Sequence, residues 1–142
     1  MKYSYKLSDA IHILTYLIVY RDDDLSSKAI AASIETNPST VRNLMTDLKT
    51  AGLINTRQGS SAPTLSTSPA EITVLDVYQA IKMDHDLLHI DPKTNPQCIV
   101  GGNIQETLNE VYADIQDTAF QRMRAITIQD IVDGVLQRHA AK

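Results

Sequence analysis

Residues 26–54 read SSKAIAASIETNPSTVRNLMTDLKTAGLI and contain the start and stop signals of two helices in close succession. A serine at the beginning can cap a short helix over residues 28–34. Asn37 followed by Pro38 marks the start of a second helix, because asparagine supplies a capping oxygen and proline at the first helical position loses no hydrogen bond. Apolar residues at spacings of three and four continue this helix to the Ala-Gly pair at 51–52, a common stop signal. The stretch therefore predicts a helix, a tight turn and a second helix.

Further elements are predicted on both sides of this pair. Residues 7–20 (LSDAIHILTYLIVY) are apolar on most sides, which is typical of a buried helix. Strand candidates at 53–56 and 64–67 flank the turn-forming stretch 58–63 (QGSSAP) and predict a β-hairpin. Helix, short helix, turn, helix and hairpin follow one another in the order of a winged helix-turn-helix, which presents its second helix to the major groove of DNA.

The rest of the chain is predicted to be helical, apart from a polar loop over residues 82–101. Capping-box patterns at 73–76 (TVLD) and 127–130 (TIQD) each open an apolar-periodic segment. Between them, residues 103–120 form a long amphipathic helix candidate.

This long helix carries an apolar stripe that a domain of this size cannot hide without a partner surface. The members of the stripe are Ile104, Leu108, Val111, Ile115 and Ala119, with Tyr112 beside them. Packing between two copies of the chain would bury the stripe, and packing onto the last helix of the same chain is the alternative. We expect a mainly α fold with a winged helix-turn-helix domain and its small hairpin wing over 1–81, a connector over 82–102 and a helical dimerisation region over 103–142.

Composition excludes several classes of protein. With 142 residues, 43% of them hydrophobic, the chain suits one folded domain with an appendage and not wholesale disorder. Its longest apolar-leaning run, 11–20, is shorter than the roughly twenty residues that cross a bilayer, and no signal sequence opens the chain, so we expect a cytoplasmic protein. The single cysteine, Cys98, excludes an intrachain disulfide, a Cys-rich zinc module and an iron–sulfur cluster held by several thiolates of one chain. No cofactor is expected.

The charge is unevenly distributed along the chain. The net charge of −4 at pH 7 argues at first against a nucleic-acid partner. However, residues 1–65 carry seven Lys/Arg and six Asp/Glu (+1), whereas residues 66–142 carry six and eleven (−5). Since an acidic chain can still present one basic face, the total charge does not decide the partner.

Polar residues suited to DNA lie on the outer side of the second predicted helix. Arginine can bind guanine with two hydrogen bonds, asparagine can bind adenine in the same way, and hydroxyls reach bases or phosphates. Such residues can also be simply the solvated face of an amphipathic helix, but the neighbouring start signal, stop signal and hairpin favour DNA contact. The candidate contacts at this helix are Asn37, Ser39, Thr40, Arg42 and Asn43, and Lys28 of the first helix is a further candidate.

Together these segments resemble the Rrf-two family of bacterial transcription regulators. The winged-helix part of the family is similar to residues 26–54, to the wing sequence QGSSAPTL (58–65) and to AEITVLDVYQAI (70–81). NPQCIVGGNIQETL (95–108), with the later ITIQDIV (126–132), resembles a branch of the family that lacks an iron–sulfur cluster.

The resemblance implies a homodimer that binds an imperfect palindrome of double-stranded DNA and usually represses transcription. It places base reading on Ser39, Thr40, Arg42 and Asn43, and minor-groove contact on the wing tip, here Gln58, Gly59, Ser60 and Ser61 with Arg57 beside them. Three features depart from the family pattern. Glu35 stands where many such turns have glycine, the wing lacks a run of glycines, and the three-cysteine cluster motif is absent.

The thiol and the histidines of the C-terminal half admit two interpretations each. Cys98 is a redox or electrophile sensor at the entrance to the long helix, or a small buried apolar residue. His85 and His89 have the i, i+4 spacing of a metal-binding helix, but a polar connector with incidental histidines is favoured. His12 is expected to be structural, and His139 is expected to lie in a frayed C-terminus.

The sequence thus predicts a dimeric winged-helix regulator, with a repressor favoured, that responds to a thiol-modifying agent or a small molecule. A ligand would change the relative orientation of the two winged units and hence the affinity for DNA. The alternative is a protein-interaction adaptor that uses the winged helix as a scaffold. An enzyme is not expected, because no activating pair surrounds the thiol and no phosphate-binding glycine loop is present.

Overall fold

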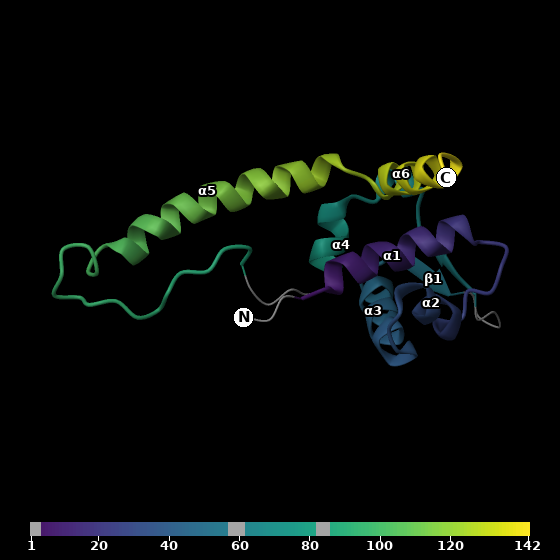
Figure 1. The fold of residues 1–142 in the computed structure, drawn as a ribbon, viewed down its shortest axis with the longest axis horizontal. Coiled ribbons are helices and arrows are strands. Elements are labelled where there is room, and N and C mark those ends of the chain that lie inside the picture. The colour runs from purple at the N-terminus through teal and green to yellow at the C-terminus, as the bar shows by residue number, and fades with distance from the viewer. Residues whose placement is uncertain (1–3, 57–61, 82–85) are drawn as a thin grey trace.

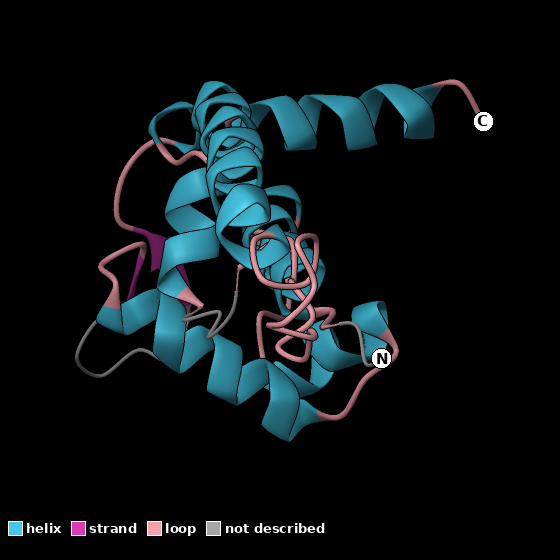
Figure 2. Ribbon diagram, turned by 90° about the vertical axis from the view of Figure 1, so that its left-hand side faces the viewer, coloured by secondary structure: helices cyan, strands magenta, loops and turns pink. Residues whose placement is uncertain are grey.

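The computed structural model describes residues 4–56, 62–81 and 86–142. Helices dominate it, and one two-stranded antiparallel sheet accompanies them (Figure 2). This confirms the predicted mainly α fold. The elements are α1 (Lys6–Val19), α2 (Ser27–Ile34), α3 (Pro38–Thr50), β1 (Ile54–Thr56), β2 (Pro63–Leu65), the 3-10 helix η1 (Pro69–Glu71), α4 (Val74–Ala80), α5 (Ile104–Ala125) and α6 (Ile128–Ala140).

Local capping fixes the ends of α2 and α3, as the sequence predicts. Ser26 caps α2 by accepting a hydrogen bond from the backbone N–H of Ala29, and Asn37 caps α3 with Pro38 in its first turn. After α3, Gly52 adopts a left-handed φ of 79°, and the backbone N–H of Leu53 closes the helix end on the carbonyl of Leu48.

The turn between α2 and α3 has a left-handed backbone at Glu35, with φ 63° and ψ 48°. Glu35 is the one non-glycine residue with positive φ among the residues described. This conformation lets the backbone N–H of Thr36 reach the carbonyl of Ala31 at 3.0 Å, which ends α2 within a tight turn. The sequence therefore places an L-residue where glycine would be unstrained.

The hydrophobic core lies where α2 and α3 cross and pack on α1. Ile30, Val41 and Leu44 are buried there, while Ile34 packs against the core and stays partly exposed. From α1, Ile13 and Leu14 are fully buried in the same cluster. The two helices of the predicted helix-turn-helix thus pack on each other and on α1.

The wing follows α3 as a short hairpin. β1 pairs with β2 so that Ile54 faces Leu65 and Thr56 faces Pro63. Ile54 and Pro63 are buried, so one residue of each strand packs the hairpin against the rest of the unit. Arg57, Gln58, Gly59, Ser60 and Ser61, predicted to contact DNA from the wing tip, lie outside the described residues.

The last helix packs on the winged-helix unit and not on the long helix. Ile128 and Val132 of α6 belong to the same core cluster as α1. The capping boxes at Thr73 and Thr127 are both present and lie opposite each other in an isolated antiparallel bridge. From the sequence, residues 128–140 are predicted to lie together with the long helix in one dimerisation region. In the structure, the apolar face of α6 packs against α1, which is far from α6 in the sequence.

The connector and α5 together form an arm, residues 86–125, that extends away from the rest of the molecule (Figure 1). α5 ends five residues later than predicted, and none of its side chains is buried. The connector runs beside it, since the backbone N–H of Leu87 donates to Gln116 at 2.9 Å and Gln105 donates to the carbonyl of Asp91 at 2.9 Å. Within the described residues, no helix is both long and apolar enough to span a membrane.

Candidate nucleic-acid interface

The start of α3 is organised around the side-chain oxygen of Asn37. Its Oδ1 accepts hydrogen bonds from the backbone N–H of Thr40 at 2.9 Å, from the Thr40 hydroxyl at 3.0 Å and from the Ser39 hydroxyl at 2.5 Å. Because both hydroxyl protons point to Asn37, the outer side of each hydroxyl oxygen presents lone pairs. Ser39 and Thr40 are therefore oriented as acceptors, which suits the amino groups of adenine or cytosine better than it suits a phosphate.

The outer face of α3 is polar over its whole length. Two cations, Arg42 and Lys49, are exposed there, and among the described residues of α3 none on this face is acidic, since Asp47 lies partly buried beside it. Such a face can bind phosphates and base edges without repelling the anionic duplex. The exposed members, at spacings of three and four, are Ser39, Arg42, Asn43, Thr46, Lys49 and Thr50.

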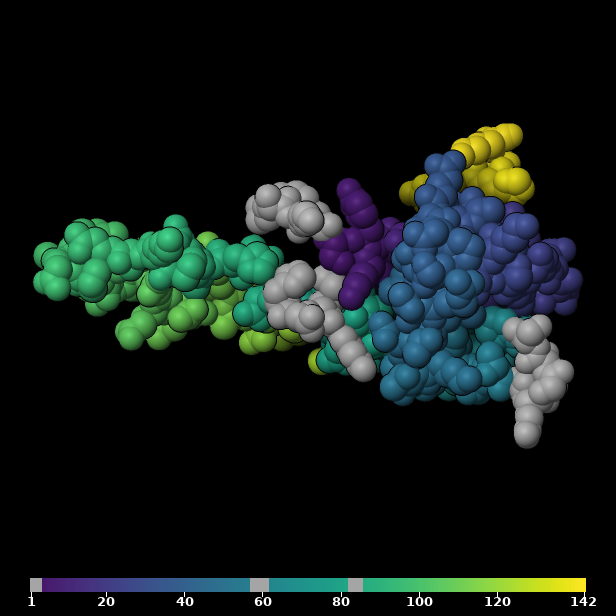
Figure 3. Space-filling model, turned by 90° about the horizontal axis from the view of Figure 1, so that it is seen from below, coloured from purple at the N-terminus to yellow at the C-terminus, as the bar shows by residue number. Residues whose placement is uncertain are grey.

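Thr46 and Lys49 extend the predicted contact set by two helical turns. The hydroxyl of Thr46 donates to the backbone carbonyl of Arg42 at 2.9 Å, so its lone pairs also face outward. Continuing the period from Asn43 to position 46 and then to 49 would have identified both residues from sequence. Figure 3 shows the α2–α3 unit on the underside of the molecule, where the arm extends away to one side and leaves it uncovered.

Lys28 is exposed in the first turn of α2, close in sequence to an acidic group. Asp24 accepts a hydrogen bond from the backbone N–H of Ser26 at 2.9 Å, and the hydrogen bonds from Ser26 hold the pKa of Asp24 below its usual value. The nearby charge of Lys28 acts in the same direction. The positive potential of Lys28 is thus partly offset by this carboxylate, which leaves Arg42 and Lys49 as the cations of the α3 face.

Cys98 is exposed near the far end of the arm, so the interpretation as a buried apolar residue is wrong. Backbone N–H groups of Gly101 and Val100 donate toward its sulfur and lower the pKa of the thiol. The glycines are required by the tight loop, because a Cβ at Gly101 would lie 2.3 Å from the carbonyl oxygen of Asn95. The thiol is accessible and its thiolate is favoured.

Among the described histidines, His12 and His139 line one pocket between α1 and α6. His89 lies in the connector outside any helix, and His85 is outside the described residues. The Nε2 of His12 is 2.8 Å from the hydroxyl oxygen of Ser33 and links α1 to α2, a structural contact. His139 lies in the last turn of α6 and not in a frayed end.

The stripe predicted for dimerisation is the least covered apolar surface of α5. Val111 and Ile115 are 47% and 48% exposed. The other members, Ile104, Leu108, Tyr112 and Ala119, are partly exposed. α5 contacts α4 near its C-terminal end, where the rings of Phe120 and Tyr78 are 5.4 Å apart. It does not fold back along α6, which lies beyond its end (Figure 1).

Residues that could hold an iron–sulfur cluster through cysteines are missing. Cys98 is the single cysteine of the chain, whereas such clusters use several thiolates. In the part of the chain that the structure describes, no group of three or more His, Cys, Asp or Glu side chains could hold a metal ion.

Comparison with known proteins agrees with this geometry. The sequence matches the model of the Rrf2 family, described as an iron-dependent transcriptional regulator, over residues 3–134. YwnA of Bacillus subtilis (strain 168), named as an HTH-type transcriptional regulator, is 33% identical over 128 residues, which are 90% of this chain and 95% of YwnA. The crystal structure of a candidate DNA-binding protein is similar with a TM-score of 0.71 and 32% identity, over 89% of this chain and 97% of that chain.

A more distant structure shares the fold. CymR, the global cysteine regulator of B. subtilis, has a TM-score of 0.67 at 19% identity, over 94% of this chain and 97% of CymR. The family description and the name of YwnA are those of transcriptional regulators, in agreement with the expectation that the chain is not an enzyme. With its single cysteine the chain departs from the iron-dependent description of its family. The chain belongs to the Rrf2 family and is a DNA-binding regulator of transcription.

Proposed function

We propose that the protein is a homodimeric repressor whose α3 helices read two half-sites of an imperfect palindrome. The observation that carries this proposal is the outer face of α3, which is polar, free of carboxylates and oriented at its start by Asn37. On this face Arg42 and Asn43 are the base-reading residues, and Ser39 and Thr40 accept hydrogen bonds from bases. Lys49 and Lys28 bind phosphates, and the wing, including Arg57, Gln58, Ser60 and Ser61, contacts the minor groove.

The dimer forms through α5. Most of the stability of an amphipathic helix comes from packing of its apolar face, and α5 has 22 residues without a buried side chain, so we infer that a second copy of the stripe covers it. Pairing two stripes removes Val111 and Ile115 from water and sets the distance between the two α3 helices. Two half-sites then act together, which compensates for the small number of cations on each α3.

An effector acts through the arm. Cys98 is exposed near the end of the arm, and its favoured thiolate is the form that oxidants and electrophiles attack. Modification of this thiol, or a small molecule bound near the connector, changes the orientation of the winged units. Release of the operator would then relieve repression.

Selection of bound duplexes from a random DNA pool, with and without oxidant, tests these proposals together. We expect an inverted repeat whose half-site centres lie about one helical turn, roughly 10 base pairs, apart. Oxidant should reduce recovery with the wild-type protein and leave recovery with Cys98→Ser unchanged. A pool without enrichment would contradict DNA reading by α3, and a recovered single half-site would contradict the dimer.

A further inference from the structure

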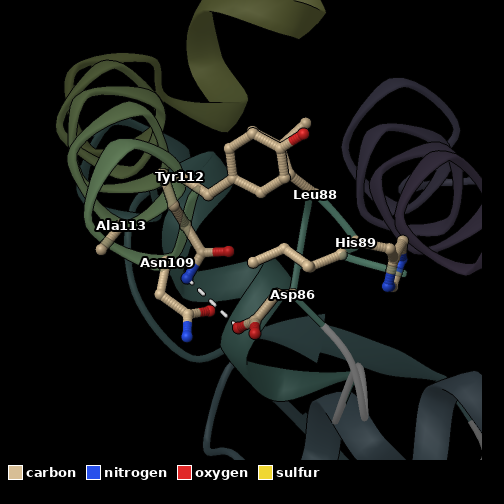
Figure 4. A pocket seen from close by; sticks show the side chains of 8 residues that line it. Asp86, Leu88, His89, Asn109, Tyr112 and Ala113 are labelled. Atoms are coloured by element: carbon tan, nitrogen blue, oxygen red, sulfur yellow. Dashed lines mark hydrogen bonds between the residues drawn. The ribbon is translucent and has the colours of Figure 1, made fainter. Parts of the chain in front are cut away.

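A cavity of about 370 Å³ lies between the connector and the middle of α5 (Figure 4). This volume falls within the range of sites that bind small organic ligands. One wall comes from the connector and the other from α5, so each wall belongs to a different part of the arm. The polar and aromatic side chains of its lining are Asp86, His89, Asn109, Tyr112 and Gln116.

The described lining of the cavity carries one carboxylate and no lysine or arginine. The carboxylate belongs to Asp86, and His89 adds an imidazole to the same lining. The carboxylate accepts a long hydrogen bond of 3.4 Å from the amide of Gln116, whose oxygen is occupied at 2.9 Å by the backbone N–H of Leu87. A cation placed beside Asp86 would gain both a charge partner and a strong acceptor.

The remaining lining suits a compact body with some apolar surface. Leu88, Ile90 and Ala113 offer aliphatic contacts, the ring of Tyr112 offers an aromatic face, and Asn109 offers an amide. Figure 4 shows Asp86 and Tyr112 on opposite sides of the hollow, with Asn109 beside them. We propose that this cavity binds a small organic amine, with its ammonium group at Asp86 and its apolar body against Tyr112 and Leu88, and that this amine is the effector of DNA binding.

The effector role rests on the proposed function and follows from the position of the cavity. Asp86 also lies close enough to Tyr78 of α4 for its charge to act on the phenol. Burial is the larger cause of the raised pKa of Tyr78, and the charge of Asp86 is the second. An amine at Asp86 therefore touches the connector and α5 beside the point where α5 packs on α4. Tyr112 lines the cavity and also lies beside the apolar stripe of α5. A ligand that contacts the Tyr112 ring would therefore favour one position of this side chain, and with it one packing of the stripe. A ligand that prefers one arrangement shifts DNA affinity by its difference in affinity for the two.

Three probes with one body and different charges test the site on the full-length protein without DNA. Tyramine carries an ammonium group, tyrosol replaces it by a hydroxyl, and 4-hydroxyphenylacetate replaces it by a carboxylate. Calorimetry should show tyramine binding about fivefold more tightly than tyrosol, the size of a partly exposed ion pair, and no binding of the acid. Equal affinities, or no binding of tyramine at millimolar concentration, would overturn the site.

Two matched variants assign the preference to one residue. Asp86→Asn should abolish the difference between tyramine and tyrosol, whereas Asp114→Asn, the same change on α5 outside the lining, should preserve it. Persistence of the difference in Asp86→Asn would overturn the assignment.

A DNA titration then separates this inference from the proposed function. Tyramine should change operator affinity in the wild type and not in Asp86→Asn. Unchanged operator affinity with tyramine bound would overturn the effector role alone. A protein that binds no DNA even without tyramine would overturn the proposed function, while amine selectivity that depends on Asp86 would still support the site.

Discussion

Thr73 and Thr127 lie opposite each other in an antiparallel bridge, and each caps the helix that follows it. The backbone N–H of Ile128 donates to the carbonyl of Ile72 at 2.8 Å, and that of Val74 donates to Ile126 at 2.9 Å. The chain thus leaves the winged-helix unit along the arm and returns to it through this bridge. The unit is therefore completed by a helix that follows the arm in sequence.

Ile128→Ala should strongly destabilise the winged-helix unit. Ile128 is fully buried in the cluster that contains α1, so truncation should cost about 2–5 kcal/mol of unfolding free energy, measured by urea denaturation. Ile99→Ala provides the matched control, because Ile99 is 87% exposed and should change stability by less than about 0.5 kcal/mol. Similar losses in the two variants would mean that α6 does not belong to the core.

Glu35→Gly should stabilise the protein. The left-handed backbone at Glu35 costs an L-residue about 1–2 kcal/mol of strain. Glycine removes this strain, but its greater backbone freedom also stabilises the unfolded chain, so part of the gain in stability is lost. We expect a net increase of about 0.5–1 kcal/mol in the free energy of unfolding, read from urea denaturation. Glu35→Gln keeps the strain and removes only the charge, so its stability should match the wild type. If Glu35→Gly is no more stable than Glu35→Gln, then the backbone at this position is not strained.

Cys98 should react with iodoacetamide at lower pH in the native protein than in the unfolded chain. Backbone N–H groups of Gly101 and Val100 lower the pKa of the thiol, so folding favours the thiolate. By linkage, its contribution to stability is present above the unfolded pKa of the thiol and is lost as pH falls through the folded one. The measurement is the alkylation rate against pH with and without urea, and coincident midpoints would contradict the arrangement.

Ile115→Glu should dissociate the proposed dimer without unfolding the protomer. Ile115 is 48% exposed in the single chain, and losing the burial of this exposed half in both protomers costs about 1.5–3 kcal/mol in total, which weakens dimerisation roughly tenfold or more. Gln121→Glu adds the same carboxylate at an exposed position on another side of α5 and serves as control. Sedimentation equilibrium measures both variants. A wild type that sediments as a monomer would exclude the dimer itself.

Local signals predicted most of the elements, because a helix start is decided by a few neighbouring residues. Asn37 with Pro38, and the boxes at Thr73 and Thr127, all form the caps that their sequences indicate. The partner of α6 was missed, because an apolar stripe shows that a face is buried and does not show against which helix. The cavity at Asp86 was missed for the same reason, since it forms only where the connector runs back along α5.

The central claim is that Arg42 on the outer face of α3 reads a base of the operator. The direct measurement is the affinity of wild type, Arg42→Ala and Arg138→Ala for the selected operator and for versions with single base-pair changes. Arg138 lies exposed on α6, which packs on α1, and serves as the matched arginine control. Arg42→Ala should lose about 1–3 kcal/mol of binding free energy and no longer discriminate at one base pair in each half-site, while Arg138→Ala binds like the wild type. If Arg42→Ala keeps both the affinity and the base preference of the wild type, then α3 does not read the operator as described.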